Sequence, residues 1–412
     1  MTNPAASMGY GRTTITVLLP FAGGYFISYL FRMVNAVIAP DLVRDLNLTA
    51  ADLGLLTAAY FITFSLVQIV LGPLLDRFGP RRIQAVLLLF MALGSVGFGF
   101  GRDQTELVVA RALIGLGAAA SLMGSLKAIS QWFPPERWVL VNSLFIGFGG
   151  LGALVATTPL EAALQYTDWR GVFFVLTGAV LLISAAIFFV VPERPNPAHG
   201  ESLARQFVGL GRIFGSAAFW RVAPLTTGLY ASAMALQGLW LGPWARDMLG
   251  AGREAVALDL QLIAIGFTVG CVLNGVISDL LVRAGLTLKR IMGLLSVIYL
   301  LTFTPFIWPF AGDHPLIWLA FGLMTNVGAL AYAIVPQQFH ISFSGRANSA
   351  LNFVVFAFAF AAQYTVGAII DLWPRTASGG YAPEGYQAAF GATAAAVVLT
   401  LLWFWVPLKK RP

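Results

Sequence analysis

The sequence predicts an all-α integral membrane protein with twelve transmembrane helices, and two observations support this prediction. Of the 412 residues, 58% are hydrophobic and only 10% are charged, whereas soluble domains carry about 25% charged residues. Apolar windows of about 20 residues, each long enough to cross a ~30 Å hydrocarbon core, follow one another along the whole chain. They are expected to be helices because an open sheet leaves backbone groups without hydrogen bonds in lipid. No stretch remains for a soluble catalytic domain, so we expect no enzyme, cofactor or metal site.

The predicted helices form two sets of six, numbered here in chain order. The first set covers residues 15–39, 51–75, 83–101, 105–133, 138–162 and 171–191, and the second covers residues 219–245, 256–282, 288–311, 315–337, 347–373 and 387–407. A proline-rich stretch from Pro192 to Pro197 interrupts helix formation between them. We therefore expect an N-terminal bundle over residues 1–192, a cytoplasmic linker with an amphipathic segment over 193–218, and a C-terminal bundle over 219–412.

The positive charges are distributed unequally between the two sides of the predicted membrane. With the N-terminus placed inside, about 16 Lys and Arg residues fall on the inner side and roughly six fall in the outer loops. This bias places both termini in the cytoplasm of a multi-pass protein in a bacterial-type inner membrane. The net charge of +7 therefore reflects topology, with membrane lipid as the surrounding partner and no nucleic acid. The first apolar stretch is too long for a signal-peptide core and is expected to be retained as helix 1.

Similar charged segments follow predicted helices 2 and 8. The first runs from Gly72 to Arg82, and the second runs from Gly275 to Arg290. They occupy the same place in the two sets of six helices, which indicates a parallel duplication of a six-helix unit. The two bundles are therefore expected to be pseudo-symmetric.

The segment from Gly72 to Arg82 resembles the G-x-L-x-D-R-x-G-x-R-R signature of the major facilitator superfamily, and the helix number and the repeat extend this resemblance over the whole chain. The resemblance implies a monomeric transporter with alternating access, whose helices 1, 4, 7 and 10 line a central cavity. It also implies a gating role for Asp76, facing the N-terminus of helix 11, and for Asp279, facing that of helix 5. The alternative is that these charges only anchor helix ends. We also expect three basic residues near these aspartates to take part in gating, and these are Arg77, Arg81 and Arg283.

A charge inside the first apolar window is the strongest sign of a binding site. Arg32 lies in the otherwise uncharged stretch 15–39, where an arginine costs roughly 2.5–3.5 kcal/mol on insertion scales. Tyr25 and Tyr29 precede it at helical spacing and share its face. A guanidinium binds a carboxylate or phosphate through two parallel hydrogen bonds. The alternative is a structural pair with a neighbouring acid. Because the predicted interior holds almost no acid, an anionic ligand is favoured.

Further candidate substrate residues lie on the other helices around the cavity. Arg111 and Lys127 of helix 4 are about 24 Å apart along its axis, so they cannot hold one small ligand together. Arg111 is the second cation expected in the cavity, whereas Lys127 either lines an inner vestibule or extends to the cytoplasm. Side chains on helices 7, 10 and 11 either bind ligand hydroxyls or hold helices together. These uncharged candidates are Gln237, Trp240, Asn326, Tyr332 and Asn352.

Small residues predict one contact between helices. Helix 5 contains Gly147, Gly149, Gly150 and Gly152, and helix 8 contains Gly266 and Gly270 at small-xxx-small spacing. Small residues at this spacing let backbones approach closely. We therefore expect these two helices to pack against each other.

The stretch from Phe31 to Asn35, followed by residues 48–54, is similar to the organic-anion branches of the superfamily. These include sugar-acid, glutamate and sialic-acid carriers and organophosphate exchangers, so the resemblance implies uptake of a small organic anion. Proton-coupled members place a carboxylate one residue before this arginine or seven after the helix 4 arginine, where this chain has Phe31 and Ala118. Proton symport, anion exchange and uniport all stay open. An exporter of hydrophobic or drug-like compounds and a non-transporting sensor are the alternative functions.

Overall fold

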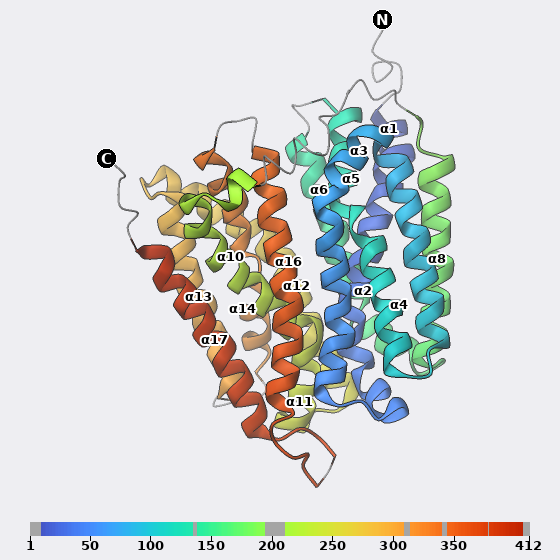
Figure 1. The fold of residues 1–412 in the computed structure, drawn as a ribbon, viewed down its shortest axis with the longest axis vertical. Coiled ribbons are helices and arrows are strands. Elements are labelled where there is room, and N and C mark those ends of the chain that lie inside the picture. The colour runs from blue at the N-terminus through green and yellow to red at the C-terminus, as the bar shows by residue number, and fades with distance from the viewer. Residues whose placement is uncertain are drawn as a thin grey trace, which may run out of the picture. The chain divides into compact units, whose positions relative to one another are not determined.

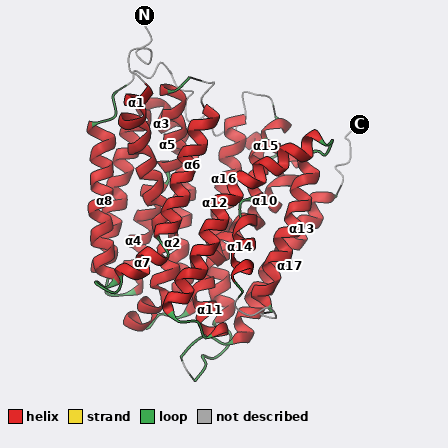
Figure 2. Ribbon diagram, turned by 180° about the vertical axis from the view of Figure 1, so that it is seen from behind, coloured by secondary structure: helices red, strands yellow, loops and turns green. Residues whose placement is uncertain are grey.

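The computed structural model describes residues 10–134, 138–193, 211–308, 314–339, 344–377 and 379–406. These residues form helices joined by short loops, with no strand among them (Figure 1; Figure 2). Within them, ten helices are long and apolar enough to cross a membrane, and Leu144–Val155 is a shorter apolar helix. The predicted all-α membrane fold is confirmed, because the described residues of each predicted window are mostly helical.

The six windows of the first half match the following elements. Helix 1 consists of α1 (Tyr10–Thr13), a π-helical turn η2 (Thr14–Leu18) and α2 (Leu19–Leu46). Helices 2 and 3 run on as α3 (Ala50–Phe100), which breaks at Gly79, where φ is 77°. Helix 4 is α4 (Gln104–Ala118) with α5 (Ala120–Trp132), helix 5 is α6 (Trp138–Val155) with α7 (Thr158–Ala163), and helix 6 is α8 (Trp169–Phe189).

The second half contains two interrupted helices. Helix 7 consists of α10 (Ala217–Ala235), a π-helical turn η4 (Leu236–Trp240) and α11 (Leu241–Leu249). Helix 10 consists of α14 (Pro315–Met324), the 3₁₀ turn η5 (Val327–Leu330), α15 (Ala331–Ile334) and η6 (Pro336–Gln338). The remaining helices are α12 (Arg253–Arg283), α13 (Leu288–Ile307), α16 (Ser344–Ile370) and α17 (Pro383–Trp405). The amphipathic segment predicted in the linker lies mostly outside the described residues.

Polar residues at the helix ends account for several boundaries. The side chain of Asp103 accepts a hydrogen bond from the Glu106 amide before α4, and that of Asp168 accepts one from the Gly171 amide before α8. Such N-caps satisfy amides that have no partner within the helix. At a C-terminus, glycine ends the helix: α11 stops at Gly250, whose φ of 67° suits glycine.

Packing divides the chain into two units. One comprises Met1–Val34 and Ile62–Leu203, and the other comprises Asn35–Phe61 and Ala204–Pro412. Here, outer and inner denote the helix ends as the charge distribution of the sequence assigns them. The segment 35–61, which holds the outer parts of helices 1 and 2, belongs to the second of these units, and the boundaries of the predicted bundles stay a prediction.

Of the glycines predicted to bring helices 5 and 8 together, Gly149, Gly152, Gly266 and Gly270 pack inside their own units. A Cβ on Gly149 would lie 2.5 Å from Tyr25 Cε1, and one on Gly152 would overlap the carbonyl oxygen of Phe26, so both glycines pack against helix 1. Gly266 and Gly270 instead pack against the backbone of α14. Each pair lets helices of its own unit pack closely. The spacing of the glycines in the sequence could not show which helix is the packing partner.

In the second unit, Asp247 at the end of α11 orders the outer loop that precedes α17. Its carboxylate accepts hydrogen bonds from the Tyr381 amide at 3.0 Å and from the Tyr386 hydroxyl at 2.9 Å. Burial raises the pKa of the Tyr381 phenol well above its usual range. This phenol therefore stays neutral at physiological pH.

Candidate functional site

Arg32 lies in the first unit and is only 7% exposed. Its guanidinium carbon is 4.6 Å from the ring centroid of Tyr29 and 5.6 Å from that of Phe64. The rings of Tyr25 and Tyr29 meet edge to face at 5.0 Å. A cation over aromatic faces is stabilised by the ring quadrupole while its edge remains able to donate hydrogen bonds. The structure thus brings together the three residues that the sequence grouped, and adds Phe64.

Helix 5 packs against Tyr25 and Tyr29, which precede Arg32 on helix 1. The ring of Phe145 in α6 stacks on Tyr25 at 4.6 Å and 23°. One turn further on, a Cβ on Gly149 would lie 2.5 Å from Tyr25 Cε1 and 3.1 Å from Tyr29 Cδ2. Only glycine therefore leaves room for both rings, and the orientation of Tyr29 under Arg32 depends on this helix.

Arg111 is 1% exposed in the core of the first unit. Its Nη1 donates a hydrogen bond to the carbonyl oxygen of Phe31 at 2.8 Å. Its guanidinium carbon lies 4.9 Å from the Phe98 ring centroid and 5.5 Å from that of Phe173. This geometry favours a positioning role, because Arg111 holds the peptide bond directly before Arg32. A direct contact of Arg111 with substrate stays a prediction.

A variant separates these two roles of Arg111. We expect Arg111→Lys to lower the free energy of unfolding by about 1–2 kcal/mol, because lysine keeps the charge but loses the planar group that stacks and donates to Phe31. The dissociation constant for substrate should change less than it does in Arg32→Lys. Thermal unfolding and ligand titration of both variants measure this. A large loss of affinity in Arg111→Lys with unchanged thermal stability would identify a substrate ligand instead.

Lys127 is half-buried in α5, on the far side of the helix interruption at Ala119. The described hydrogen bond at this residue involves its backbone, whose carbonyl oxygen accepts from Ser130 Oγ at 2.8 Å. The predicted vestibule role of the Lys127 side chain stays a prediction.

In the second unit, two tyrosines each hold an asparagine side chain. The Tyr230 hydroxyl donates to Asn326 Oδ1 at 3.0 Å, and the Tyr332 hydroxyl donates to Asn352 Oδ1 at 2.9 Å. The two rings meet edge to face at 6.4 Å. Because both amide oxygens accept from tyrosines, both amide nitrogens are presented as donors. We call these four residues the amide cluster. Three of them were predicted site residues, and Tyr230 is added by its contact.

Three of the predicted site residues lie where a helix departs from regular α-helix. Asn326 is at the interruption between α14 and η5, and the π-helical turn η4 contains Gln237 and Trp240. Interrupted and π-helical segments often mark functional sites in membrane proteins, because they free backbone groups and redirect side chains. Gln237 is 8% exposed, and its ligand role stays a prediction.

Trp240 has a packing role in the second unit. It is fully buried, and its indole Nε1 donates to the carbonyl oxygen of Gln363 at 3.3 Å. The Gln363 side chain in turn donates to the carbonyl oxygen of Met234 at 3.1 Å. These bonds tie α16 to helix 7. The predicted contact of Trp240 with substrate stays a prediction.

The predicted gating residues lie at the inner helix ends. Asp279 pairs with Arg283 of its own helix at 2.7 Å, and both side chains are exposed, so this pair contributes little to stability. Arg81 Nε donates to the carbonyl oxygen of Phe188 at 2.9 Å, and Arg77 is exposed. The side chain of Asp76 lies outside the described residues. The gating roles therefore stay predictions.

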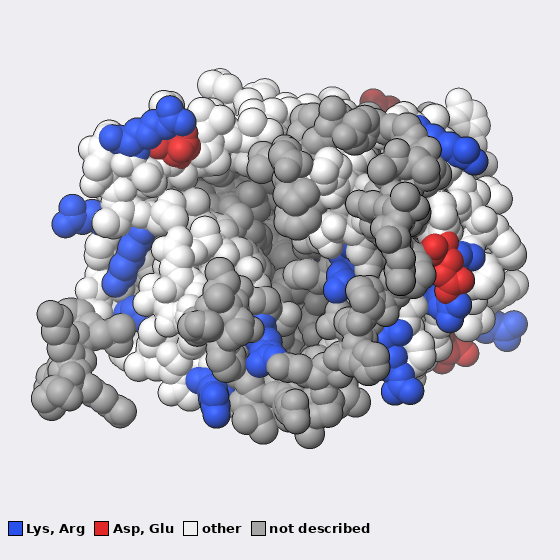
Figure 3. All heavy atoms as spheres, turned by 90° about the horizontal axis from the view of Figure 1, so that it is seen from above, with Lys and Arg blue, Asp and Glu red and all other residues white. Residues whose placement is uncertain are grey.

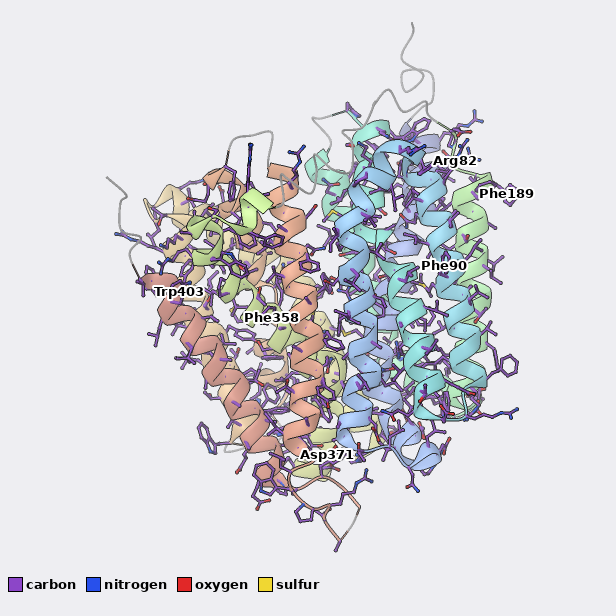
Figure 4. The ribbon with its side chains drawn as sticks, in the orientation of Figure 1. Arg82, Phe90, Phe189, Phe358, Asp371 and Trp403 are labelled. Carbon is purple, nitrogen blue, oxygen red and sulfur yellow. The ribbon has the colours of Figure 1, made fainter. Side chains whose placement is uncertain are left out.

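The inner end is basic. Among the charged side chains of the described residues, the face seen in Figure 3 carries mainly Lys and Arg. Figure 4 places Arg82 at this end, beside Phe189 near the end of α8, and Arg82 pairs there with Glu193. This distribution agrees with the charge bias found in the sequence.

Among the described residues, the predicted windows contain two carboxylates that are almost fully buried, Glu161 and Asp259. Asp259 lies in the second turn of α12 and is only 7% exposed. Its position inside the predicted window 256–282 was the signal that could have found it. A carboxylate buried in a membrane helix is a typical place for proton uptake and release. No group of three or more residues that could hold a metal ion occurs in the part of the chain that the structure describes.

Comparison with known proteins finds one family and several relatives. The family model described as Major Facilitator Superfamily matches residues 21–370. A protein named probable sulfoacetate transporter, from Cupriavidus necator, is 25% identical over 349 residues, which are 80% of this chain and 80% of that protein. The hexuronate transporter of Escherichia coli K12 is 26% identical over 278 residues, which are 63% of this chain and 64% of that protein.

Solved structures share the fold. The bacterial homologue of the human lysosomal transporter Spinster, in its inward-facing and unoccupied conformation, has a TM-score of 0.77 and 15% sequence identity. The match covers 96% of this chain and 97% of that one. At this identity the likeness concerns the fold alone.

Proposed function

The chain belongs to the Major Facilitator Superfamily, and from this premise we propose that it takes up a small organic anion by alternating access. The names of two relatives support this substrate class, because one is named a probable sulfoacetate transporter and the other a hexuronate transporter. Both compounds are small, anionic and rich in oxygen. The buried guanidinium of Arg32 matches that chemistry.

The observation that carries the proposal is the setting of Arg32. The side chain is 7% exposed inside the first unit and lies over the Tyr29 ring. A rigidly held guanidinium with little water around it binds a carboxylate or sulfonate more strongly than an exposed one does. Arg32 therefore binds the charged group of the substrate, and Tyr25 and Tyr29 fix its direction.

The amide cluster binds the uncharged oxygens of the substrate. Asn326 and Asn352 donate through their amide nitrogens, and their tyrosines keep the amide oxygens engaged. We expect Tyr332→Phe to weaken substrate binding by roughly 2- to 12-fold, the effect of losing one neutral hydrogen bond that orients Asn352. Ligand titration of the purified variant measures this.

Tyr299→Phe is the matched control for Tyr332→Phe. Tyr299 is fully buried in the same unit, and its hydroxyl pairs with Ser232 Oγ at 2.7 Å, away from the amides. Its loss should lower thermal stability without changing the dissociation constant. Equal losses of affinity in both variants would mean that the amide cluster only supports the fold.

Transport into proteoliposomes tests the proposed function. The panel contains a sulfoacetate, a hexuronate, a short carboxylate and a neutral hexose, each with and without a pH gradient. We expect saturable uptake of at least one anion and none of the hexose. Uptake that responds to the gradient would show proton coupling, for which Asp259 is the candidate carboxylate. Transport of only neutral or hydrophobic cationic compounds, or binding without transport, would contradict the proposal.

The membrane orientation completes the proposal. The chain is a monomer in a bacterial-type inner membrane with both termini in the cytoplasm. The basic inner end supports this orientation. Asp76 with Arg77 and Arg81, and Asp279 with Arg283, act at that end as gating groups.

A further inference from the structure

The outer end of α16 is joined to the start of α3 by a carboxylate. Asp371 directly follows the last residue of α16, and Figure 4 shows it at that end. Its Oδ1 accepts a hydrogen bond from the Ala50 amide at 3.0 Å, and its Oδ2 accepts one from the Ala51 amide at 2.6 Å. The first amides of a helix have no partner within it, and the helix dipole favours a negative charge there. Asp371 thus serves as an N-cap supplied by a helix more than 300 residues further along the chain.

Two neighbouring contacts join the same parts of the chain. Arg375 donates to the carbonyl oxygen of Leu48 at 2.6 Å. Arg253 at the start of α12 donates to both carboxylate oxygens of Asp41, each at 2.8 Å. In each case one partner lies in the segment 35–61 and the other in the part of the chain after residue 204. The outer ends of helices 1 and 2 are therefore held by charged groups of the second unit.

The backbones of α3 and α16 also meet closely below Asp371. A Cβ on Gly367 would overlap the carbonyl oxygen of Ala50, and a Cβ on Gly54 would lie 2.8 Å from that of Gln363. The rings of Phe61 and Phe356 continue this contact at 6.1 Å. Asp371 therefore ends a continuous packing surface between the two helices.

We propose that Asp371 is an outer latch, which caps the N-terminus of α3 when the outer side is closed and releases it when that side opens. The inference rests on the proposed transport by alternating access. The segment 35–61 belongs to α2 and α3, whose remaining residues pack with the first unit. Both helices run without a break across the unit boundaries at residues 34/35 and 61/62, so a movement of these helices as rigid bodies with the first unit breaks the bonds of Asp371. An exposed carboxylate makes this contact breakable, since water can replace the lost hydrogen bonds.

The latch mirrors the gating role predicted for Asp76. Because the N-terminus of α3 meets the C-terminal end of α16, the first part of α3 and α16 run antiparallel. Asp76 lies near the inner end of that part of α3 and is expected to cap the N-terminus of α16. The two helices then carry the same device at opposite ends, and each carboxylate stabilises one of the two states.

Labelling of a buried outer cysteine tests the latch without any substrate. In a Cys271→Ser background, Ala58→Cys places a thiol on the face of α3 that contains Gly54 and Phe61, at a position that is 0% exposed. We expect Asp371→Ala to raise the rate of labelling by a membrane-impermeant maleimide roughly tenfold, the equilibrium shift typical of losing one N-cap. Asp371→Asn, which keeps one acceptor, should give an intermediate rate.

Asp52→Ala is the matched control, because Asp52 lies in the first turn of α3 and caps the same helix end through a local contact. Its Oδ2 accepts from the Thr49 amide at 3.0 Å, and its own amide donates to Thr49 Oγ1 at 3.1 Å. This local contact does not join α3 to α16, so labelling should stay within about twofold of the parent. An unchanged rate in Asp371→Ala, or equal increases in both variants, would overturn the latch. Thermal unfolding of each variant confirms that it is folded, and failure of anion uptake leaves this test intact.

Discussion

Replacing Arg32 by glutamine should abolish most of the affinity for the transported anion. Glutamine keeps a polar amide of similar length but loses the charge and the paired donors. Hydrogen bonds to charged groups contribute about 1.5–3 kcal/mol, which corresponds to a roughly 10- to 150-fold higher dissociation constant. Arg32→Lys should recover only part of this loss, because an ammonium cannot form the planar pair or stack on Tyr29 in the same way. Equilibrium binding to the detergent-purified protein measures both variants.

A buried arginine of the second unit provides the control for Arg32→Gln. Arg221 in α10 is 6% exposed, its Nη1 donates to the carbonyl oxygen of Trp403 at 2.6 Å, and its guanidinium lies 4.3 Å from a Trp403 ring centroid. Arg221→Gln should lower thermal stability and leave the dissociation constant within about twofold of the parent, because this arginine holds two helices together. If both substitutions weaken binding equally, the effect of Arg32 would be one of general stability.

Replacing Gly152 by alanine should displace Arg32, although the two residues lie on different helices. The added methyl group would overlap the carbonyl oxygen of Phe26, and backbone cannot rotate away as a side chain can. Overpacking of this kind costs about 1–3 kcal/mol. Helix 1 must shift away from α6, which moves Arg32, six residues further along, from its place over Tyr29. We expect a lower thermal unfolding temperature and a loss of transport greater than that in Tyr332→Phe.

The same helix offers a control with the same change in composition. Gly147 has no atom within 4 Å of the place where a Cβ would be added. Gly147→Ala should therefore leave transport unchanged and raise the stability of α6 slightly, since alanine favours helix over glycine by up to ~1 kcal/mol. Thermal unfolding and uptake are measured for both alanine variants in parallel. If Gly147→Ala is as damaging as Gly152→Ala, close packing of helices 1 and 5 is not the cause.

The sequence was sufficient to predict the helices and the centre of the candidate site. Hydropathy and length identify membrane spans because the bilayer requires both, and a single arginine among apolar residues is conspicuous for the same reason. Helical spacing placed Tyr25 and Tyr29 beside Arg32, since neighbours on one helix face follow from its geometry. The amides on helices 10 and 11 were also identified, although not their tyrosine partners as pairs.

Contacts between helices could not be predicted in the same way. Small residues indicate that a helix packs closely but do not name its partner, which is why the packing of Gly266 against α14 was not foreseen. Charge alone does not show which way a side chain points, so the hydrogen bond of Arg111 to the Phe31 carbonyl oxygen could not be predicted. The capping of α3 by Asp371 could not be predicted, because its partners lie more than 300 residues away along the chain.

The central claim is that the charge of Arg32 binds the charge of the substrate, and a thermodynamic cycle tests it most directly. The dissociation constants of the best transported carboxylate and of its neutral carboxamide are measured for the parent protein and for Arg32→Gln. We expect the parent to prefer the carboxylate by roughly 10- to 150-fold and the variant to bind both compounds about equally. An undiminished preference for the carboxylate in Arg32→Gln would contradict this assignment.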